Sequence, residues 1–172
     1  MPTPRRPHRA TRPAVAALPS FEALDATHRQ VMLTLERLQH LVEQVDRHGV
    51  DDPARKSAAE ICDFFDKTAR AHHEAEEQVV FPGLLASGDA ALVQHVQRLQ
   101  QDHGWLEEDW RELQPQLLTL AEGYNGFDLD FLRAAVPVFT DLYRDHIALE
   151  EDIVYPESRR RNASLRSPRG CA

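Results

Sequence analysis

A histidine followed four residues later by a glutamate occurs twice in this chain, each time in similar surroundings. The first copy, HHEAEEQVVFP, begins at His72, and the second, HIALEEDIVYP, begins at His146. Aligning the two copies places Glu76 on Glu150. Residues four apart on a helix lie one turn apart on one face, so each copy offers an imidazole and a carboxylate to a metal ion. Two such helices suit a pair of metal ions bridged by carboxylates.

Apolar residues recur at spacings of three and four along most of the chain, which predicts an all-α fold. The expected helices cover about residues 20–47, 52–86, 89–115 and 128–156. Asp52 is expected to cap the second helix, with Pro53 at its first helical position. Pro115 is expected to kink or end the third helix, and the fourth is expected to end near Pro156.

Two further histidines, at positions 28 and 103, lie on the apolar faces of the first and third helices. In an antiparallel hairpin, two residues are level when they are equally far from the turn. The midpoints between successive histidines fall in HGVDDP, between Ser87 and Gly88, and in EGYNGFD, which are the three expected turns. An up-down-up-down four-helix bundle, built from two helical hairpins related by a pseudo-twofold axis, therefore brings four histidines to one level. They are His28, His72, His103 and His146.

Glu76 and Glu150 face inward at the same level, where the inner faces carry no Lys or Arg. Burying an ionised carboxylate without a partner is costly. Metal ions remove that cost, and a mixed set of imidazoles and carboxylates suits iron, manganese or zinc. The sequence thus predicts two metal ions about 3.5 Å apart. Glu76 and Glu150 would bridge them, and the four histidines would bind at the two ends.

The 172 residues suffice for one domain, which we place at residues 20–156. The segments 1–19 and 157–172 are rich in Arg with Pro or Ser and are predicted to be disordered tails. A formal net charge of −8 disfavours nucleic-acid binding and suits a cation site. No apolar run reaches the ~18–20 residues of a membrane span. The two cysteines form no disulfide framework, so a cytoplasmic location is expected.

The four histidines and two glutamates, in this order and spacing, resemble the hemerythrin-like, or HHE cation-binding, domain family over about residues 20–156. The resemblance implies a non-haem centre of two iron ions with an oxo or hydroxo bridge. The ligand positions that it implies are His28, His72, Glu76, His103, His146 and Glu150.

The chain departs from the oxygen-carrying hemerythrins at two of the ligand positions. Those proteins have His-x3-His on the third helix and His-x4-Asp on the fourth. In this chain, the residue four positions after His103 is Glu107, and the fourth helix carries His-x3-Glu from His146 to Glu150. The chain therefore resembles the HHE branch more than the reversible oxygen carriers. Glu107 is an alternative ligand in place of the missing histidine. His73 is another, although a regular helix turns it away from the centre.

The resulting hypothesis is a di-iron protein that binds or senses a small ligand, such as dioxygen, nitric oxide or iron itself. The alternative is a di-iron enzyme: an oxidase, a peroxidase or an iron donor in iron–sulfur repair. The sequence marks no organic substrate pocket and no particular protein partner. Tyr155 is interpreted as a packing residue, with a hydrogen bond near the site as the alternative. Its backbone lies about 7 Å further along the helix than that of Glu150.

Overall fold

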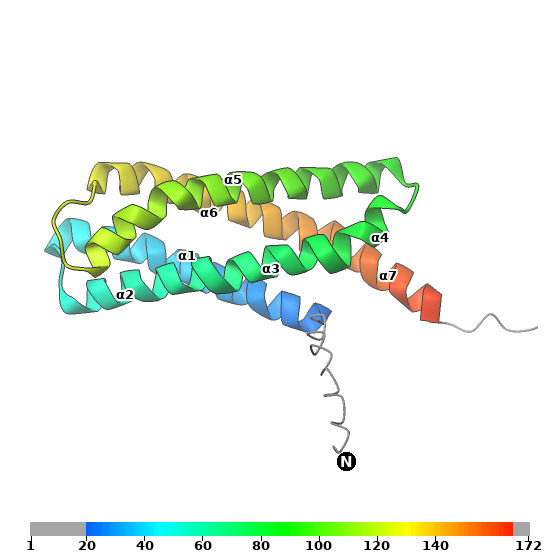
Figure 1. The fold of residues 1–172 in the computed structure, drawn as a ribbon, viewed down its shortest axis with the longest axis horizontal. Coiled ribbons are helices and arrows are strands. Elements are labelled where there is room, and N and C mark those ends of the chain that lie inside the picture. The colour runs from blue at the N-terminus through cyan, green and yellow to red at the C-terminus, as the bar shows by residue number, and fades with distance from the viewer. Residues whose placement is uncertain (1–19, 167–172) are drawn as a thin grey trace, which may run out of the picture.

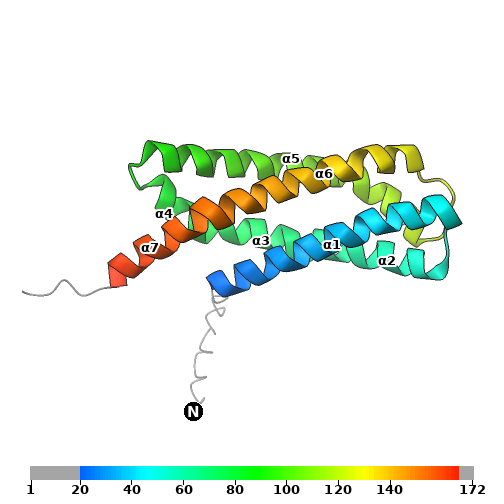
Figure 2. The same cartoon turned by 180° about the vertical axis from the view of Figure 1, so that it is seen from behind.

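Four helical rods run alternately up and down along the molecule (Figure 1), which confirms the predicted all-α four-helix bundle. The computed structural model describes residues 20–166. Its α-helices and its π-helical segments, labelled η, are in chain order α1 (Phe21–His48), α2 (Asp52–Asp63), η1 (Phe64–Ala69), α3 (Arg70–Ala75), η2 (Glu76–Val80), α4 (Phe81–Leu85), α5 (Ala90–Ala121), α6 (Leu129–Leu149), η3 (Glu150–Val154) and α7 (Tyr155–Arg166). The second rod comprises α2 to α4, and the fourth comprises α6 to α7. Figure 2 shows the fourth rod running alongside α1.

Each rod begins at a polar residue whose side chain accepts a hydrogen bond from the first turn. Ser20 caps α1, Asp89 caps α5 and Asp128 caps α6. The cap of α2 is Asp51 and not Asp52 as predicted, because the Asp51 side chain accepts a hydrogen bond from the backbone N–H of Ala54 at 2.8 Å. These caps satisfy backbone donors that have no partner inside the helix.

Two of the predicted helix ends were wrong. Pro115 does not end α5, which continues past this exposed proline to Ala121. The fourth rod does not end near Pro156 but continues as α7 to Arg166, so residues 157–166 are helical. Arg159 holds this extension against α1 through an ion pair with Asp25 at 2.6 Å. The other residues of the predicted tails, 1–19 and 167–172, lie outside the described residues.

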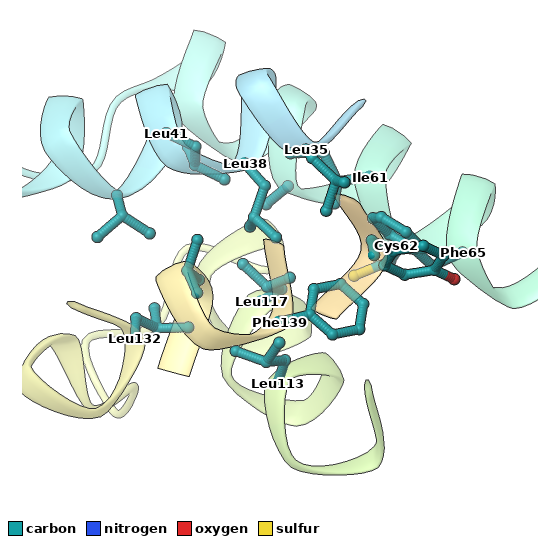
Figure 3. Packing of buried hydrophobic residues seen from close by; sticks show 14 of the residues in the cluster. Leu35, Leu38, Leu41, Ile61, Cys62, Phe65, Leu113, Leu117, Leu132 and Phe139 are labelled. Carbon is teal, nitrogen blue, oxygen red and sulfur yellow. The ribbon is translucent and has the colours of Figure 1, made fainter. Parts of the chain in front are cut away.

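The apolar core has two parts that lie toward opposite ends of the bundle. The larger part contains Leu35, Leu38, Phe65 and Phe139 (Figure 3) and reaches the turn between α1 and α2. The smaller part is built by residues from all four rods near the other end: Leu24, Val80, Phe81, Leu84, Leu92, Val96, Leu99, Val154 and Tyr155. On the first three rods, the predicted site residues lie in sequence between these two parts. On the fourth, Glu150 does so, and His146 directly precedes Ile147 of the larger part. A buried polar layer therefore separates two apolar ones.

Within residues 20–166, no helix combines the length and the apolar character that crossing a membrane would require.

Candidate metal centre

The polar layer gathers all six residues that the sequence singled out. The side chains come from all four rods, and each residue is less than 9% exposed: His28, His72, Glu76, His103, His146 and Glu150. The histidines that are equally far from each turn therefore lie level in the bundle, as the midpoints between them predict. Burial of two carboxylates and four imidazoles in one layer is costly unless something binds them.

One group of ligand atoms lies toward α1. His28, His72, Glu76 and Glu150 each contribute one atom, and these atoms lie within 4.8 Å of one another. His28 Nε2 is 3.1 Å from Glu150 Oε2, and His72 Nε2 is 3.3 Å from Glu76 Oε1. The four side chains are thus close enough to surround one cation.

A second group lies toward α5, and it contains a histidine that the predicted ligand set left out. Its members are His73, Glu76, His103 and His146, with ligand atoms again within 4.8 Å of one another. The rings of His73 and His103 stack with a centroid distance of 4.1 Å. His146 Nε2 is 3.3 Å from Glu150 Oε1. The layer therefore holds five imidazoles.

The carboxylates of Glu76 and Glu150 each face both groups. Glu76 directs Oε1 toward His72 and Oε2 toward His103, the latter at 3.5 Å from Nε2. Glu150 directs Oε2 toward His28 and Oε1 toward His146. Each carboxylate thus has one oxygen in each half of the layer, which is the arrangement of a bridging ligand.

Helix irregularity explains why His73 faces inward. A π turn takes one more residue than an α turn, so it rotates the following residues relative to a regular helix. The segments η1 and η2 lie on either side of the turn that carries His72 and His73. A regular helix throughout the second rod would turn His73 away from the centre, and the only sequence signal for its inward position is the adjacent pair of histidines. A π segment also begins at Glu150, so both glutamates stand at the same kind of irregularity.

Glu107, the alternative ligand, lies outside both groups. Its side chain is 56% exposed, and its Oε1 is 3.0 Å from Arg111 on the next turn of α5. Of the two alternative ligands, His73 and not Glu107 lies within the α5 group.

Acidic residues outside the layer hold two of the histidines in place. Glu151 accepts a hydrogen bond from Nδ1 of His28 at 3.0 Å, and Glu77 accepts one from Nδ1 of His103 at 3.1 Å. A carboxylate can only accept, so each imidazole carries its proton on Nδ1 and leaves an Nε2 lone pair facing the layer. The second glutamate of each motif copy thus orients the histidine on the first helix of the other hairpin.

Several polar atoms in the layer are buried without a hydrogen-bond partner. They are both ring nitrogens of His72 and of His146, Nε2 of His103, Oε2 of Glu76 and both carboxylate oxygens of Glu150. Buried polar groups in folded proteins are nearly always paired, so this concentration of unpaired donors and acceptors requires an explanation. A bound cation would satisfy most of them at once.

The titration behaviour of the layer reflects its burial. Burial lowers the pKa of His72 to about 3 and holds the pKa of His73 well below its usual range, so both imidazoles are neutral. Burial and the neighbouring Glu150 raise the pKa of Glu76, whereas His146 and His28 outweigh burial and lower the pKa of Glu150. Two carboxyl groups this close cannot both ionise easily without a cation, while neutral imidazoles are ready to bind one.

A pocket of about 680 Å³ opens between the second rod and α5 and reaches the α5 side of the layer. His73 and His103 line its inner part, together with the aromatic side chains of Phe65, Trp110 and Tyr143. Polar side chains complete its wall, among them Gln78, Gln100, Gln114 and Arg70. The sequence did not reveal this pocket, because its walls come from segments that are far apart in the chain, namely 65–78, 100–114 and Tyr143.

Comparison with known proteins agrees with this geometry. Residues 20–158 match the family described as Hemerythrin HHE cation binding domain. The chain is also 29% identical over 133 residues to an uncharacterized protein of Haemophilus influenzae, in an alignment that covers 77% of this chain and 75% of that protein. No solved structure matched the chain. Because the family match spans most of the chain, including every residue of the polar layer, the protein belongs to the hemerythrin HHE cation-binding domain family.

Proposed function

We propose that the polar layer binds two iron ions and that this pair binds or senses a small ligand such as dioxygen or nitric oxide. The single observation that carries the proposal is the placement of the Glu76 and Glu150 oxygens, one from each carboxylate in each group. One ion would bind at the α1 group and the other at the α5 group, with both carboxylates as bridges. Iron with an oxo or hydroxo bridge is what membership of the family suggests.

The spacing of the donor atoms supports two separate ions. Two ligand atoms about 2.1 Å from one metal lie about 3.0–3.4 Å apart at ordinary coordination angles. The nitrogen-to-oxygen distances within the two groups are 3.1 to 3.5 Å for the four closest pairs. The donor set fits iron, because it combines imidazole with carboxylate and contains no thiolate.

The two proposed metal positions differ in their number of protein donors. The position at the α1 group has His28, His72 and one oxygen from each bridging glutamate. The position at the α5 group has the other oxygen of each glutamate and three histidines. The α1 position therefore has one donor fewer, and we assign the exchangeable coordination position to it. A bound iron pair would supply redox capacity and an affinity for small ligands there.

The protein itself would contribute exclusion of water and fixed orientation. The two apolar parts of the core close the layer from both ends of the bundle. Glu151 and Glu77 keep His28 and His103 in the tautomer that presents Nε2 inward. Few groups in the layer need to reorganise when a ligand binds.

An enzyme is the second candidate, and the pocket is the observation that favours it. A cavity of about 680 Å³ that ends at His73 and His103 is large enough for a small organic molecule. Such a molecule would approach the α5 metal position, away from the position that we assign to the small ligand.

The reaction with dioxygen separates these candidates. The protein would be loaded anaerobically with ferrous iron and its absorbance recorded before and after oxygen is added, and again after evacuation. A new visible band that disappears on evacuation supports ligand binding or sensing. A permanent oxidised spectrum, with continued consumption of oxygen or peroxide when a reductant is present, supports an enzyme. Absence of any spectral change in iron-loaded protein contradicts both.

A further inference from the structure

Tyr155, at the start of α7, brings a hydroxyl group into the polar layer that the proposed ligand set does not use. The side chain is fully buried, and its hydroxyl contacts Oε1 of Glu76. The same hydroxyl is 3.3 Å from Nε2 of His28. Both neighbours belong to the α1 group, so the hydroxyl lies at the metal position that has one protein donor fewer.

The Tyr155 ring is held in a fixed orientation. It stacks on the ring of His28 with a centroid distance of 5.2 Å and an interplanar angle of 12°. The edge-to-face contact with Phe21 has a centroid distance of 5.7 Å, and the Arg159 guanidinium lies 5.9 Å from the ring centroid. These contacts leave the hydroxyl little freedom to turn away from the layer.

The other half of the bundle provides an internal comparison. Phe81 occupies the position in the first motif copy that Tyr155 occupies in the second. Its ring stacks on His103 with a centroid distance of 5.6 Å and an angle of 18°, much as Tyr155 stacks on His28. The packing role is therefore filled equally well by phenylalanine. The hydroxyl is an addition that is confined to the α1 side.

The chemistry of the contact with Glu76 indicates what the hydroxyl does. A carboxylate oxygen only accepts hydrogen bonds, so the hydroxyl donates its proton to Glu76. When Oε1 of Glu76 binds a metal ion, one of its lone pairs is used and it becomes a weaker hydrogen-bond acceptor, so the hydroxyl can donate to a better acceptor close by. A ligand at the α1 metal position would be such an acceptor.

We propose that Tyr155 donates a hydrogen bond to the small ligand at the α1 metal position and so favours ligands with a lone pair on their free end. Dioxygen, nitric oxide and small anions such as azide belong to this class. The inference rests on the proposed function, because it requires a metal ion between His28 and His72.

Azide binding to the iron-loaded, oxidised protein tests the inference. Azide would be titrated into wild-type protein, Tyr155→Phe and the matched control Tyr143→Phe, with the azide-to-iron absorption as readout and iron counted in each sample. Tyr143 is also buried, but it lies beside His73 and His146 on the α5 side. We expect Tyr155→Phe to keep its iron and to raise the azide Kd about tenfold, as loss of a hydrogen bond to a charged group predicts. Tyr143→Phe should change the Kd less than about twofold.

Several results would overturn the inference. An unchanged or lower azide Kd in Tyr155→Phe with full iron content would show that the hydroxyl does not stabilise the ligand. Loss of iron from this variant, or a tyrosinate-to-iron absorption band in the wild type, would make the hydroxyl a metal ligand instead. Wild-type protein that binds no iron would overturn the proposed function and this inference together, whereas the other results leave the proposed function intact.

Discussion

His73 and Glu107 are the two alternatives for the additional metal ligand, and only His73 lies within a group of possible ligand atoms. His73 is packed against His103 within the α5 group, whereas Glu107 is exposed and paired with Arg111. A histidine in the layer removes the need for a carboxylate from α5. It also gives the α5 group three imidazoles, whereas the α1 group has two.

Substitution of His73 and substitution of Glu107 should affect the iron content of the protein differently. His73→Ala should lower the iron content from two ions per chain to about one, because it removes a nitrogen from one of the two groups. Glu107→Ala should keep both ions, since the Glu107 side chain is exposed, pairs with Arg111 and belongs to neither group of ligand atoms. Iron analysis of the purified variants after anaerobic loading and dialysis measures this. Iron loss in Glu107→Ala with full retention in His73→Ala would reverse the assignment.

Much of the site at the residue scale could be predicted from the sequence. The repeated His-x3-Glu and the midpoint argument identified four histidines and two glutamates that do lie together. His73 was assigned to the wrong face, because the rotation introduced by the π segments is not visible in a hydrophobic pattern that assumes 3.6 residues per turn. For Tyr155, packing was favoured over a hydrogen bond near the site, because the rise along a helix takes no account of the reach of a long side chain that stacks across to α1.

Among the elements, the capping residues decide where the rods begin. The sequence placed the start of the second rod correctly to within one residue but chose the second of two adjacent aspartates as the cap. Asp51 accepts the hydrogen bond from Ala54 and also contacts Gln44 at 3.1 Å. Asp52 is almost fully exposed and contacts only Arg55. The local sequence Asp-Asp-Pro fits either choice, and only the backbone conformation distinguishes them.

The two aspartates make a matched pair for a stability measurement. Asp51→Ala should lower the free energy of unfolding by about 1 kcal/mol, because it leaves a helix donor unpaired. The corresponding fall in Tm is about 2–4 °C for a domain of this size. Asp52→Ala should cost less than about 0.5 kcal/mol, as is usual for an exposed residue. Thermal denaturation followed by circular dichroism compares them, and equal losses in the two variants would refute the assignment of the cap.

The ends of the third and fourth rods could not be predicted, for a different reason. A proline inside a helix removes one hydrogen bond and crowds the carbonyl four residues earlier, and the cost is smaller where the freed carbonyl can bond water. Pro115 and Pro156 are both exposed. Whether a helical position faces water depends on how the rods pack, and the sequence alone does not contain that information directly.

At the scale of the whole molecule, the bundle alternates apolar, polar and apolar layers, and the larger apolar part contains Cys62. Burial raises the pKa of this thiol from its ordinary value of 9.0 to about 12. Because the folded pKa lies above the unfolded one, the contribution of the neutral thiol to stability is complete below about pH 9. It is lost progressively as the pH rises toward about 12.

The consequence is a difference in alkaline stability between the wild type and Cys62→Ala. Between about pH 8 and about pH 10.5, the wild type should lose about 2 kcal/mol more of its free energy of unfolding than the variant, which lacks the titrating group. Guanidinium denaturation at the two pH values measures both losses, with Cys171→Ser in both backgrounds to remove the other thiol. Equal losses would mean that Cys62 is not held neutral in the core.

The binding of two metal ions by the polar layer is the central claim, and metal analysis tests it most directly. Protein loaded anaerobically with ferrous iron and dialysed would be compared with Glu76→Gln/Glu150→Gln, which keeps the shape of both side chains but removes their charge. We predict two iron ions per wild-type chain, one for each group of ligand atoms, and almost none in the variant, whose helical circular dichroism should be unchanged. A wild type without iron, or a folded variant that still binds two ions, would contradict the claim.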